Sequence, residues 1–257
     1  MAKCQLLGES SRSLADHVTG PKAIGGRLSV RSVIIRLMPR TTTRKLARQA
    51  VDRARRVRRR DETPYATHAP VLIALAQVMR VRRVLEFGAG MYSTLLFLNR
   101  VAFPELMEIV SYEDDADWAK RVALDAAGDD RLSMRTVASV PECVPDTIDD
   151  FDLILIDDSS SATIRTRTVL SVANRRPINA LVAIHDYELR ELALATRSFD
   201  HVYCFRTFTP QVGVAWFGDA MSKRLLSQTE SRIARHRTSL PVADIARWTT
   251  ALHRQPK

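Results

Sequence analysis

Three ionisable residues, Asp157, His185 and Asp186, stand at the ends of two apolar segments. Residues 151–157 end in Asp157, and residues 181–184 are followed directly by His185 and Asp186. Histidine has an unperturbed pKa near neutrality, so His185 can act as a general base that a carboxylate orients. Alternatively, Asp157 and Asp186 can hold a hard cation such as Mg²⁺, which favours ionisation of a bound oxygen. Both chemistries stay open, and we expect these three residues to be catalytic.

A second segment runs from an apolar stretch into a turn with two glycines. Residues 83–87 are followed by Gly88, Ala89 and Gly90, and a further apolar run begins at Leu95. Glycine allows the backbone to bend sharply and to approach a ligand, and a Ser or Thr hydroxyl can cap the helix that follows. We expect valine at Gly88 or Gly90 to fill this turn without unfolding the sheet. The residues expected to contact a ligand here are Glu86, Phe87, Gly88, Ala89, Gly90, Ser93 and Thr94.

An acidic cluster follows the next apolar segment, residues 109–113. It consists of Glu113, Asp114 and Asp115 and lies one βαβ step beyond the glycine turn. A carboxylate at this strand end can accept hydrogen bonds from both hydroxyls of a ribose. We therefore expect Glu113 to bind a ribose, with Asp114 as the alternative, although Asp114 or Asp115 can instead cap the next helix.

The acidic residue before a Gly-x-Gly turn resembles motif I of class I S-adenosylmethionine-dependent methyltransferases. The matching residues are Glu86, Gly88 and Gly90. This resemblance implies an enzyme that binds S-adenosylmethionine, with the turn against the methionine part of the cofactor and Asp157 as a further contact. A dinucleotide-binding fold would need a third glycine where Ser93 stands, and Glu86 would repel a diphosphate. A non-catalytic nucleoside- or NAD-binding protein is the alternative from another class.

The strand-end residues are also similar to those of divalent-metal-dependent O-methyltransferases. In that group an Asp closes the fourth strand and an Asp-Asn pair closes the fifth, whereas this chain has Asp157 and then His185-Asp186. A His-Asp pair resembles sugar- and polysaccharide-directed O-methyltransferases. The resemblance, over residues 67–217, implies a small hydroxylated acceptor, such as a sugar or natural product, and Mg²⁺ at Asp157 and Asp186. His185 departs from the metal-dependent pattern, and Ala138-Ser139 stands where an acidic residue often lies near the adenine.

Apolar segments alternate with helical patterns from Thr67 onward, which predicts a parallel sheet with crossover helices. The expected helices are centred near Leu75, Leu96, Val122, Val169 and Leu192. Residues 206–211 are too few for a crossover helix, so the last strand should be antiparallel. We expect an α/β fold with a Rossmann-like seven-stranded sheet, mostly parallel, and helices on both faces. The expected strands are residues 83–87, 109–113, 132–137, 151–157, 180–185, 201–205 and 212–217. His68 and His201 are interpreted as ordinary surface or strand-end residues.

The net charge of +10 is concentrated at the N-terminus. Residues 1–60 hold sixteen Lys and Arg against three acidic residues, so the rest of the chain carries −3. We expect a basic arm over residues 1–60 with a helix at 43–60, a methyltransferase domain over 61–218 and a helical tail over 219–257. The arm could bind phosphates of a nucleic acid, but the sequence has neither an Asn/Asp-Pro-Pro-aromatic motif nor a Pro-Cys pair. A nucleic-acid methyltransferase is therefore the alternative function.

Cellular location can be addressed from hydropathy and cysteines. No apolar run approaches the roughly 20 residues needed to cross a bilayer, and the three cysteines are far apart and in no Cys-x-x-Cys spacing. We expect a cytoplasmic protein that acts on a small molecule, with an oligomeric state that the sequence leaves open. An Arg-rich, acid-poor N-terminus also has the composition of an organellar transit peptide.

Overall fold

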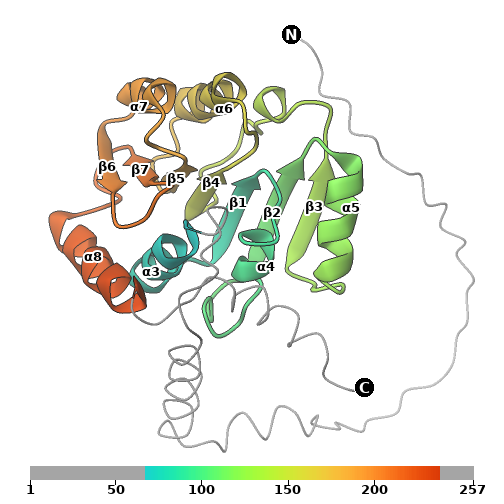
Figure 1. Ribbon diagram of the computed structural model, residues 1–257, viewed down its shortest axis with the longest axis horizontal. Coiled ribbons are helices and arrows are strands. Elements are labelled where there is room, and N and C mark those ends of the chain that lie inside the picture. The colour runs from blue at the N-terminus through green and yellow to red at the C-terminus, as the bar shows by residue number, and fades with distance from the viewer. Residues whose placement is uncertain (1–66, 238–257) are drawn as a thin grey trace, which may run out of the picture.

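The computed structural model describes residues 67–237, which form one sheet with helices on both faces (Figure 1). The sheet order is β3-β2-β1-β4-β5-β7-β6, and β7 alone runs antiparallel to its neighbours β5 and β6. This confirms the predicted seven-stranded Rossmann-like sheet. The strands are β1 Arg83–Phe87, β2 Glu108–Glu113, β3 Leu132–Thr136, β4 Leu153–Ile156, β5 Leu181–His185, β6 His201–Phe205 and β7 Val212–Trp216. The basic arm, its helix and residues 238–257 lie outside the described residues.

Six α-helices are described in residues 67–237, and no helix there has the length and hydropathy to cross a membrane. Helices α3, α4 and α8 cover one face of the sheet, and α6 and α7 cover the other. The helices are α3 Ala69–Met79, α4 Thr94–Phe97, α5 Ala116–Asp125, α6 Ala162–Arg175, α7 Arg190–Ala195 and α8 Lys223–Arg237, with short 3₁₀ helices at Val140–Glu142 and Thr196–Ser198.

The central strand β4 is buried on both faces, as parallel strands between two helical layers are. Successive side chains of a strand point to opposite faces. Leu153 and Leu155 accordingly pack towards α3 and α8, while Ile154 and Ile156 pack towards α6 and α7. A continuous apolar run is therefore what this position in the sheet requires.

Helix α8 packs against α3, so the residues 223–237 that we expected in a tail lie on the body of the domain (Figure 1). Ile233 is buried in the same core as α3, and Arg232 Nη1 donates a hydrogen bond to Gln77 Oε1 at 2.8 Å. The last described helix thus holds the first described helix in place.

The glycine turn after β1 lies against the end of β4. Gly88 has a φ of 91°, and a Cβ atom there would lie 2.3 Å from the carbonyl oxygen of Asp157 and 2.5 Å from its carbonyl carbon. Any side chain at Gly88 would have to displace the backbone that directly follows β4, so Gly88→Val would perturb the sheet edge as well as fill the turn, and Gly90 is the better position for a test. A Cβ atom at Gly90 would first meet Ser93 Oγ, at 2.8 Å, and this hydroxyl can rotate away.

Glu86 connects the segment after the glycine turn to the neighbouring strand β2 through hydrogen bonds of its buried side chain. Its side chain is fully buried, and Oε2 accepts hydrogen bonds from Thr94 Oγ1 and Ser111 Oγ, both at 2.6 Å. Oε1 has no hydrogen-bond partner among residues 67–237. Burial raises the pKa of Glu86 to about 7, although the hydroxyl hydrogen bonds act in the opposite direction. Glu86 is thus a buried acid that can carry its proton near neutral pH.

The raised pKa of Glu86 should make stability depend on pH. Between pH 4.5 and about pH 7 the folded protein keeps a proton that the unfolded chain has released. The free energy of unfolding should therefore fall as pH rises through this window, by about 3 kcal/mol at most. Glu86→Gln keeps the shape and cannot ionise, so it should remove this part of the pH dependence. Urea unfolding of both proteins at about pH 5 and about pH 8 measures it.

Glu191, which is exposed on α7, supplies the control. Glu191→Gln should retain the pH dependence of the wild type. An identical pH dependence in wild type and Glu86→Gln would contradict the assignment.

Candidate functional site

A cavity of about 330 Å³ lies beside the glycine turn, at the edge of the sheet where the parallel strands end. The backbone of residues 88–93 forms one wall, and the side chains of His68, Trp118 and Asp157 form others. Trp118 Nε1 donates a hydrogen bond to the carbonyl oxygen of Ala89 at 2.7 Å, which fixes the indole beside the turn. The volume is within the roughly 300–1,000 Å³ of small-molecule sites.

Only some of the residues predicted to contact a cofactor line the cavity. Gly88, Ala89, Gly90, Ser93 and Asp157 line the cavity. Glu86 and Thr94 lie behind the turn, where Thr94 Oγ1 accepts a hydrogen bond from the Gly90 N–H at 2.9 Å. Phe87 is fully buried in the core beneath α6 and α7. Ser93 is the N-cap residue of α4, but its hydroxyl makes no capping hydrogen bond, so that part of the prediction is wrong.

Glu113 fastens the turn to the end of β2. Its Oε2 accepts from the Ala89 N–H and its Oε1 from the N–H groups of Asp114 and Asp115, all at 3.0 Å. Burial raises the pKa of Glu113 while these backbone hydrogen bonds lower it. A ribose hydroxyl could therefore donate only to the lone pairs of the Glu113 carboxylate that these three backbone N–H groups do not occupy. Asp114 is exposed, and Asp115 caps α5 by accepting from the Trp118 N–H at 2.9 Å.

The predicted catalytic residues Asp157, His185 and Asp186 do come together, because β4 and β5 are neighbours. His185 Nδ1 lies 3.2 Å from Asp157 Oδ2 and 3.8 Å from Asp186 Oδ1. Burial alone would raise the pKa of Asp157, but the hydrogen bond with His185 and the charges of His185, His68 and Arg165 lower it overall. Asp157 is therefore a carboxylate at neutral pH.

A buried arginine forms ion pairs with both Asp157 and Asp186, the two carboxylates that we predicted to bind Mg²⁺. Arg165 of α6 lies with Nη2 at 2.8 Å from Asp157 Oδ1 and with Nη1 at 2.5 Å from Asp186 Oδ2. Nη1 also donates to the carbonyl oxygen of His185 at 3.3 Å. A cation between these carboxylates would have to displace the guanidinium, so the pair does not fit a Mg²⁺ site.

Sequence reasoning missed Arg165, although a signal was present. Thr168, Val169 and Val172 follow it at helical spacing and are buried, so Arg165 belongs to the buried face of α6. An arginine on such a face needs a carboxylate partner. Asp158, which follows Asp157, is also buried and accepts a hydrogen bond from Thr168 Oγ1 at 2.5 Å, which connects the end of β4 to α6.

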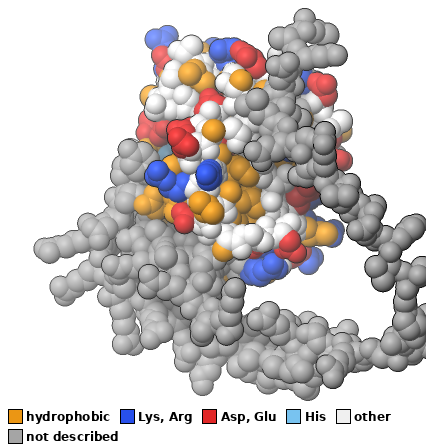
Figure 2. Space-filling view, turned by 90° about the vertical axis from the view of Figure 1, so that its right-hand side faces the viewer, with side chains coloured by type: hydrophobic (Ala, Val, Ile, Leu, Met, Phe, Trp, Pro, Cys, Tyr) orange, Lys and Arg blue, Asp and Glu red, His pale blue; other side chains and the backbone are white. Residues whose placement is uncertain are grey.

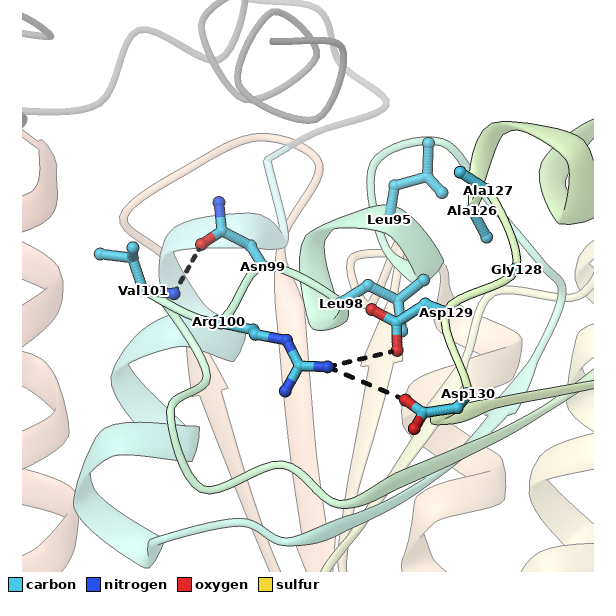
Figure 3. A pocket seen from close by; sticks show the side chains of 10 residues that line it. All are labelled: Leu95, Leu98, Asn99, Arg100, Val101, Ala126, Ala127, Gly128, Asp129 and Asp130. Carbon is cyan, nitrogen blue, oxygen red and sulfur yellow. Dashed lines mark hydrogen bonds and ion pairs between the residues drawn. The ribbon is translucent and has the colours of Figure 1, made fainter. Parts of the chain in front are cut away.

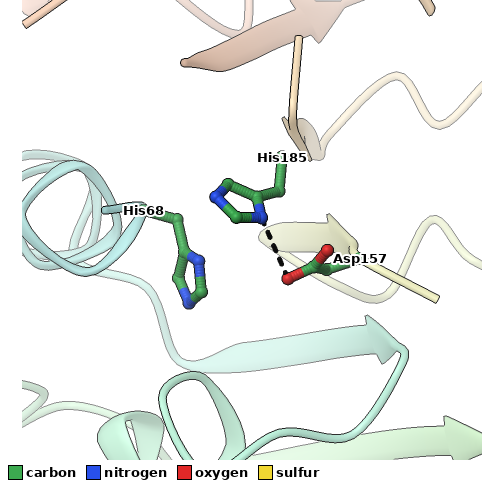
Figure 4. Close-up of side chains that lie close together, drawn as sticks. All are labelled: His68, Asp157 and His185. Atoms are coloured by element: carbon green, nitrogen blue, oxygen red, sulfur yellow. Dashed lines mark ion pairs between the residues drawn. The ribbon is translucent and has the colours of Figure 1, made fainter. Parts of the chain in front are cut away.

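His68 lies in this site, so its interpretation as an ordinary surface residue is wrong. It precedes α3 as its N-cap residue, is 2% exposed and lines the cavity. Its ring contacts that of His185 edge to face, with 4.7 Å between the centroids (Figure 4). Burial, and then the neighbouring His185, lower the pKa of His68 to about 4, so His68 is neutral at neutral pH. His201 is exposed at the start of β6, as expected.

A second hollow, of about 570 Å³, lies where α4 ends and where α5 turns into β3 (Figure 3). This is the edge of the sheet where parallel strands begin, away from the glycine turn. Arg100 lies 3.9 Å from Asp129 and 3.8 Å from Asp130, so the charges here pair with one another. None of the residues predicted to be catalytic or to bind a cofactor or metal lines this hollow, and we assign no chemistry to it.

Comparison with known proteins yields no matching family model and no matching curated protein. Among solved structures, a putative O-methyltransferase from Klebsiella pneumoniae is 19% identical with a TM-score of 0.46, over 73% of this chain and 95% of that one. Cofactor-bound Rv0187 from MTB is 21% identical with a TM-score of 0.44, over 76% and 98%. Human methyltransferase-like protein 13 in complex with SAH is 15% identical with a TM-score of 0.46, over 68% and 92%.

These matches are distant, and the strand order decides the fold. A sheet ordered β3-β2-β1-β4-β5-β7-β6 with an antiparallel β7 is the arrangement typical of methyltransferases. Residues 67–237 therefore have the fold of class I S-adenosylmethionine-dependent methyltransferases.

Proposed function

We propose that the protein transfers a methyl group from S-adenosylmethionine to a hydroxyl group of a small molecule, such as a sugar or a natural-product scaffold. The observation that carries this proposal is the double position of Asp157. Asp157 lines the cavity beside the glycine turn, and its carboxylate contacts His185, so one residue connects the proposed cofactor site to the proposed acceptor site.

The chemistry of the cavity lining supports this cofactor. S-adenosylmethionine carries a positive sulfonium and no phosphate, and Asp157 supplies a negative charge at the wall. No Lys or Arg lines this cavity among the described residues, which disfavours a dinucleotide with its diphosphate. Met91, Tyr92 and Trp118 add apolar and aromatic surface of the kind that small-molecule sites use.

Methyl transfer to a hydroxyl requires alignment of the acceptor and loss of its proton. S-adenosylmethionine supplies the methyl group when it is bound. His68 and Asp157 stand at the cavity wall, and His185 lies directly behind Asp157. Arg165 and Asp186 hold Asp157 in position from the other side. We propose that the cluster of His68, Asp157 and His185 promotes the loss of the acceptor proton.

A nucleic-acid methyltransferase is the second candidate, because residues 1–60 carry a net charge of +13. The described residues add no comparable basic surface on the side of β3 and α5, where the uncovered part carries acidic and basic side chains together (Figure 2). The small-molecule acceptor is therefore the proposal that we develop.

Cofactor binding is the first test. S-adenosylhomocysteine should bind the wild type in the micromolar range by titration calorimetry, and NAD should not. Gly90→Val places a branched side chain at the cavity wall and meets only the rotatable Ser93 hydroxyl, so binding should be lost while the fold is kept. Ala193→Val adds a similar side chain at an exposed position of α7 and should bind normally. A folded Gly90→Val protein with wild-type affinity would exclude this cofactor site.

Turnover is the second test. Transfer of labelled methyl groups to a panel of hydroxylated small molecules and to RNA identifies the acceptor class. With an identified acceptor, His185→Ala should lower turnover by about 10²-fold or more, the scale for loss of a residue in proton transfer, and leave affinity for S-adenosylhomocysteine nearly unchanged. His201→Ala is the histidine control and should keep full turnover. Methylation of RNA alone would refute the small-molecule acceptor, and full turnover in His185→Ala would refute the role of the cluster.

A further inference from the structure

The hydrogen bond of His68 determines which of its nitrogens carries the proton. Nε2 lies 3.2 Å from the carbonyl oxygen of Tyr92. A carbonyl oxygen can only accept a hydrogen bond, so Nε2 is the donor. In the neutral ring the lone pair is then on Nδ1, which is buried and has no hydrogen-bond partner among residues 67–237. A buried acceptor of this kind costs free energy unless something binds it.

The same reasoning applies to His185. The hydroxyl of Thr67 donates its hydrogen to the carbonyl oxygen of Pro210 at 2.9 Å. Thr67 Oγ1, at 3.2 Å from His185 Nε2, can then accept a hydrogen bond from this nitrogen. In that tautomer the lone pair of His185 is on Nδ1, which lies 3.2 Å from Asp157 Oδ2. Two such atoms are held at this distance by a proton, as in the hydrogen bond described above, or by a metal ion that replaces the proton.

Three potential ligand atoms converge at one point. His68, Asp157 and His185 each offer one ligand atom, a ring nitrogen or a carboxylate oxygen, and these atoms lie within 4.8 Å of one another. Figure 4 shows the His68 and His185 rings and the Asp157 carboxylate turned towards a common centre, from the start of α3 and the ends of β4 and β5. Asp157 Oδ2 is the oxygen that Arg165 leaves for this centre, because Arg165 binds Oδ1.

We propose that His68, Asp157 and His185 form a binding site for one divalent transition-metal ion of the Zn²⁺ class. Two imidazole nitrogens and one carboxylate oxygen suit Zn²⁺, Co²⁺ or Ni²⁺, whereas Mg²⁺ prefers oxygen ligands. Ligand atoms about 2.0–2.2 Å from one ion are at most about 4.4 Å apart, so closing the site needs only small side-chain movements. This ligand set differs from the Asp157–Asp186 pair, which Arg165 occupies.

The surroundings have the features that orient metal ligands. The other ring nitrogen of each imidazole has an oxygen partner: His68 Nε2 donates to the carbonyl oxygen of Tyr92, and His185 Nε2 can donate to Thr67 Oγ1. Arg165 holds the ligand carboxylate, and Asp186 balances the charge of Arg165. Such outer partners fix the tautomer and the orientation of the ligands.

Three protein ligands leave a coordination position for another molecule, as in catalytic zinc sites. His68 and Asp157 line the cavity, so this position faces the space beside the glycine turn. A role for the ion in the reaction rests on the proposed function. The hydroxyl oxygen of the acceptor would bind the ion and lose its proton to water, and its lone pair would then form the bond to the methyl carbon as the carbon–sulfur bond breaks, leaving that electron pair on sulfur.

Metal binding can be tested without turnover. The full chain, freed of any affinity tag and of metal by a chelator, is titrated with CoCl₂ and ZnCl₂ by visible absorption and calorimetry. We expect one equivalent of Co²⁺ to bind with the absorption of a nitrogen- and oxygen-coordinated ion, Zn²⁺ to displace it, and excess Mg²⁺ not to compete.

Two variants remove the ligand atoms and keep the outer hydrogen bonds. In His68→Gln and His185→Gln the amide nitrogen can take the place of Nε2 and still donate to Tyr92 or Thr67, while the Nδ1 lone pair is lost. Each variant should weaken Co²⁺ binding by at least about 10-fold. His201→Gln, an exposed histidine on β6, should bind Co²⁺ as the wild type does. Circular dichroism of each variant verifies that it is folded.

Two results would overturn the metal site. One is the absence of stoichiometric Co²⁺ and Zn²⁺ binding by the folded wild type, which would mean that a proton rather than a metal separates His185 from Asp157. The other is unchanged affinity in folded His68→Gln or His185→Gln. Calorimetry with S-adenosylhomocysteine on the same samples separates the two proposals. Cofactor binding without metal binding rejects the metal site alone, and metal binding without cofactor binding rejects the proposed function alone.

Discussion

The contact between Gly88 and the backbone of Asp157 is the constraint on which the candidate site depends. A hydrogen atom in place of a side chain allows the turn after β1 to lie directly on the end of β4. The positive φ of Gly88 directs the following residues away from the sheet and around the cavity. Asp157 is thereby held between the glycine turn and the two histidines, and a larger residue at position 88 would push the turn and the end of β4 apart.

The same edge of the sheet gathers several carboxyl groups, and they are stabilised in different ways. Glu86 is buried and can keep its proton near neutrality, whereas Glu113 accepts three backbone N–H groups. Asp158 accepts the hydroxyl of Thr168, and Arg165 lies between Asp157 and Asp186. Leaving several charged carboxylates unpaired in such a place would be costly. This distribution keeps the cavity wall negative at Asp157 without a net repulsion that would open the edge.

Much of the fold could be predicted from the sequence, because the apolar segments of a doubly covered sheet are continuous and local. β1 and β6 have the predicted bounds, and the short connection before β7 correctly indicated its antiparallel direction. The juxtaposition of Asp157 and His185 followed from the strand order. His68 and Arg165 could not be placed in this way, since neither lies next to a glycine turn or a strand end in the sequence. The helical pattern of α6 indicates only that Arg165 is buried, and the partners of both residues arise from the packing of α3 and α6 onto the sheet.

The packing of α8 on α3 affects the order in which the cavity can form during synthesis of the chain. His68 stands at the start of the first described helix, and that helix is covered by Ile233 and Arg232 from the last one. Synthesis on the ribosome proceeds from the N-terminus, so the turn and Asp157 emerge long before the segment that covers α3. The wall of the cavity that contains His68 is therefore completed only after α8 has been synthesised, so a nascent chain contains the glycine turn before it contains this finished wall.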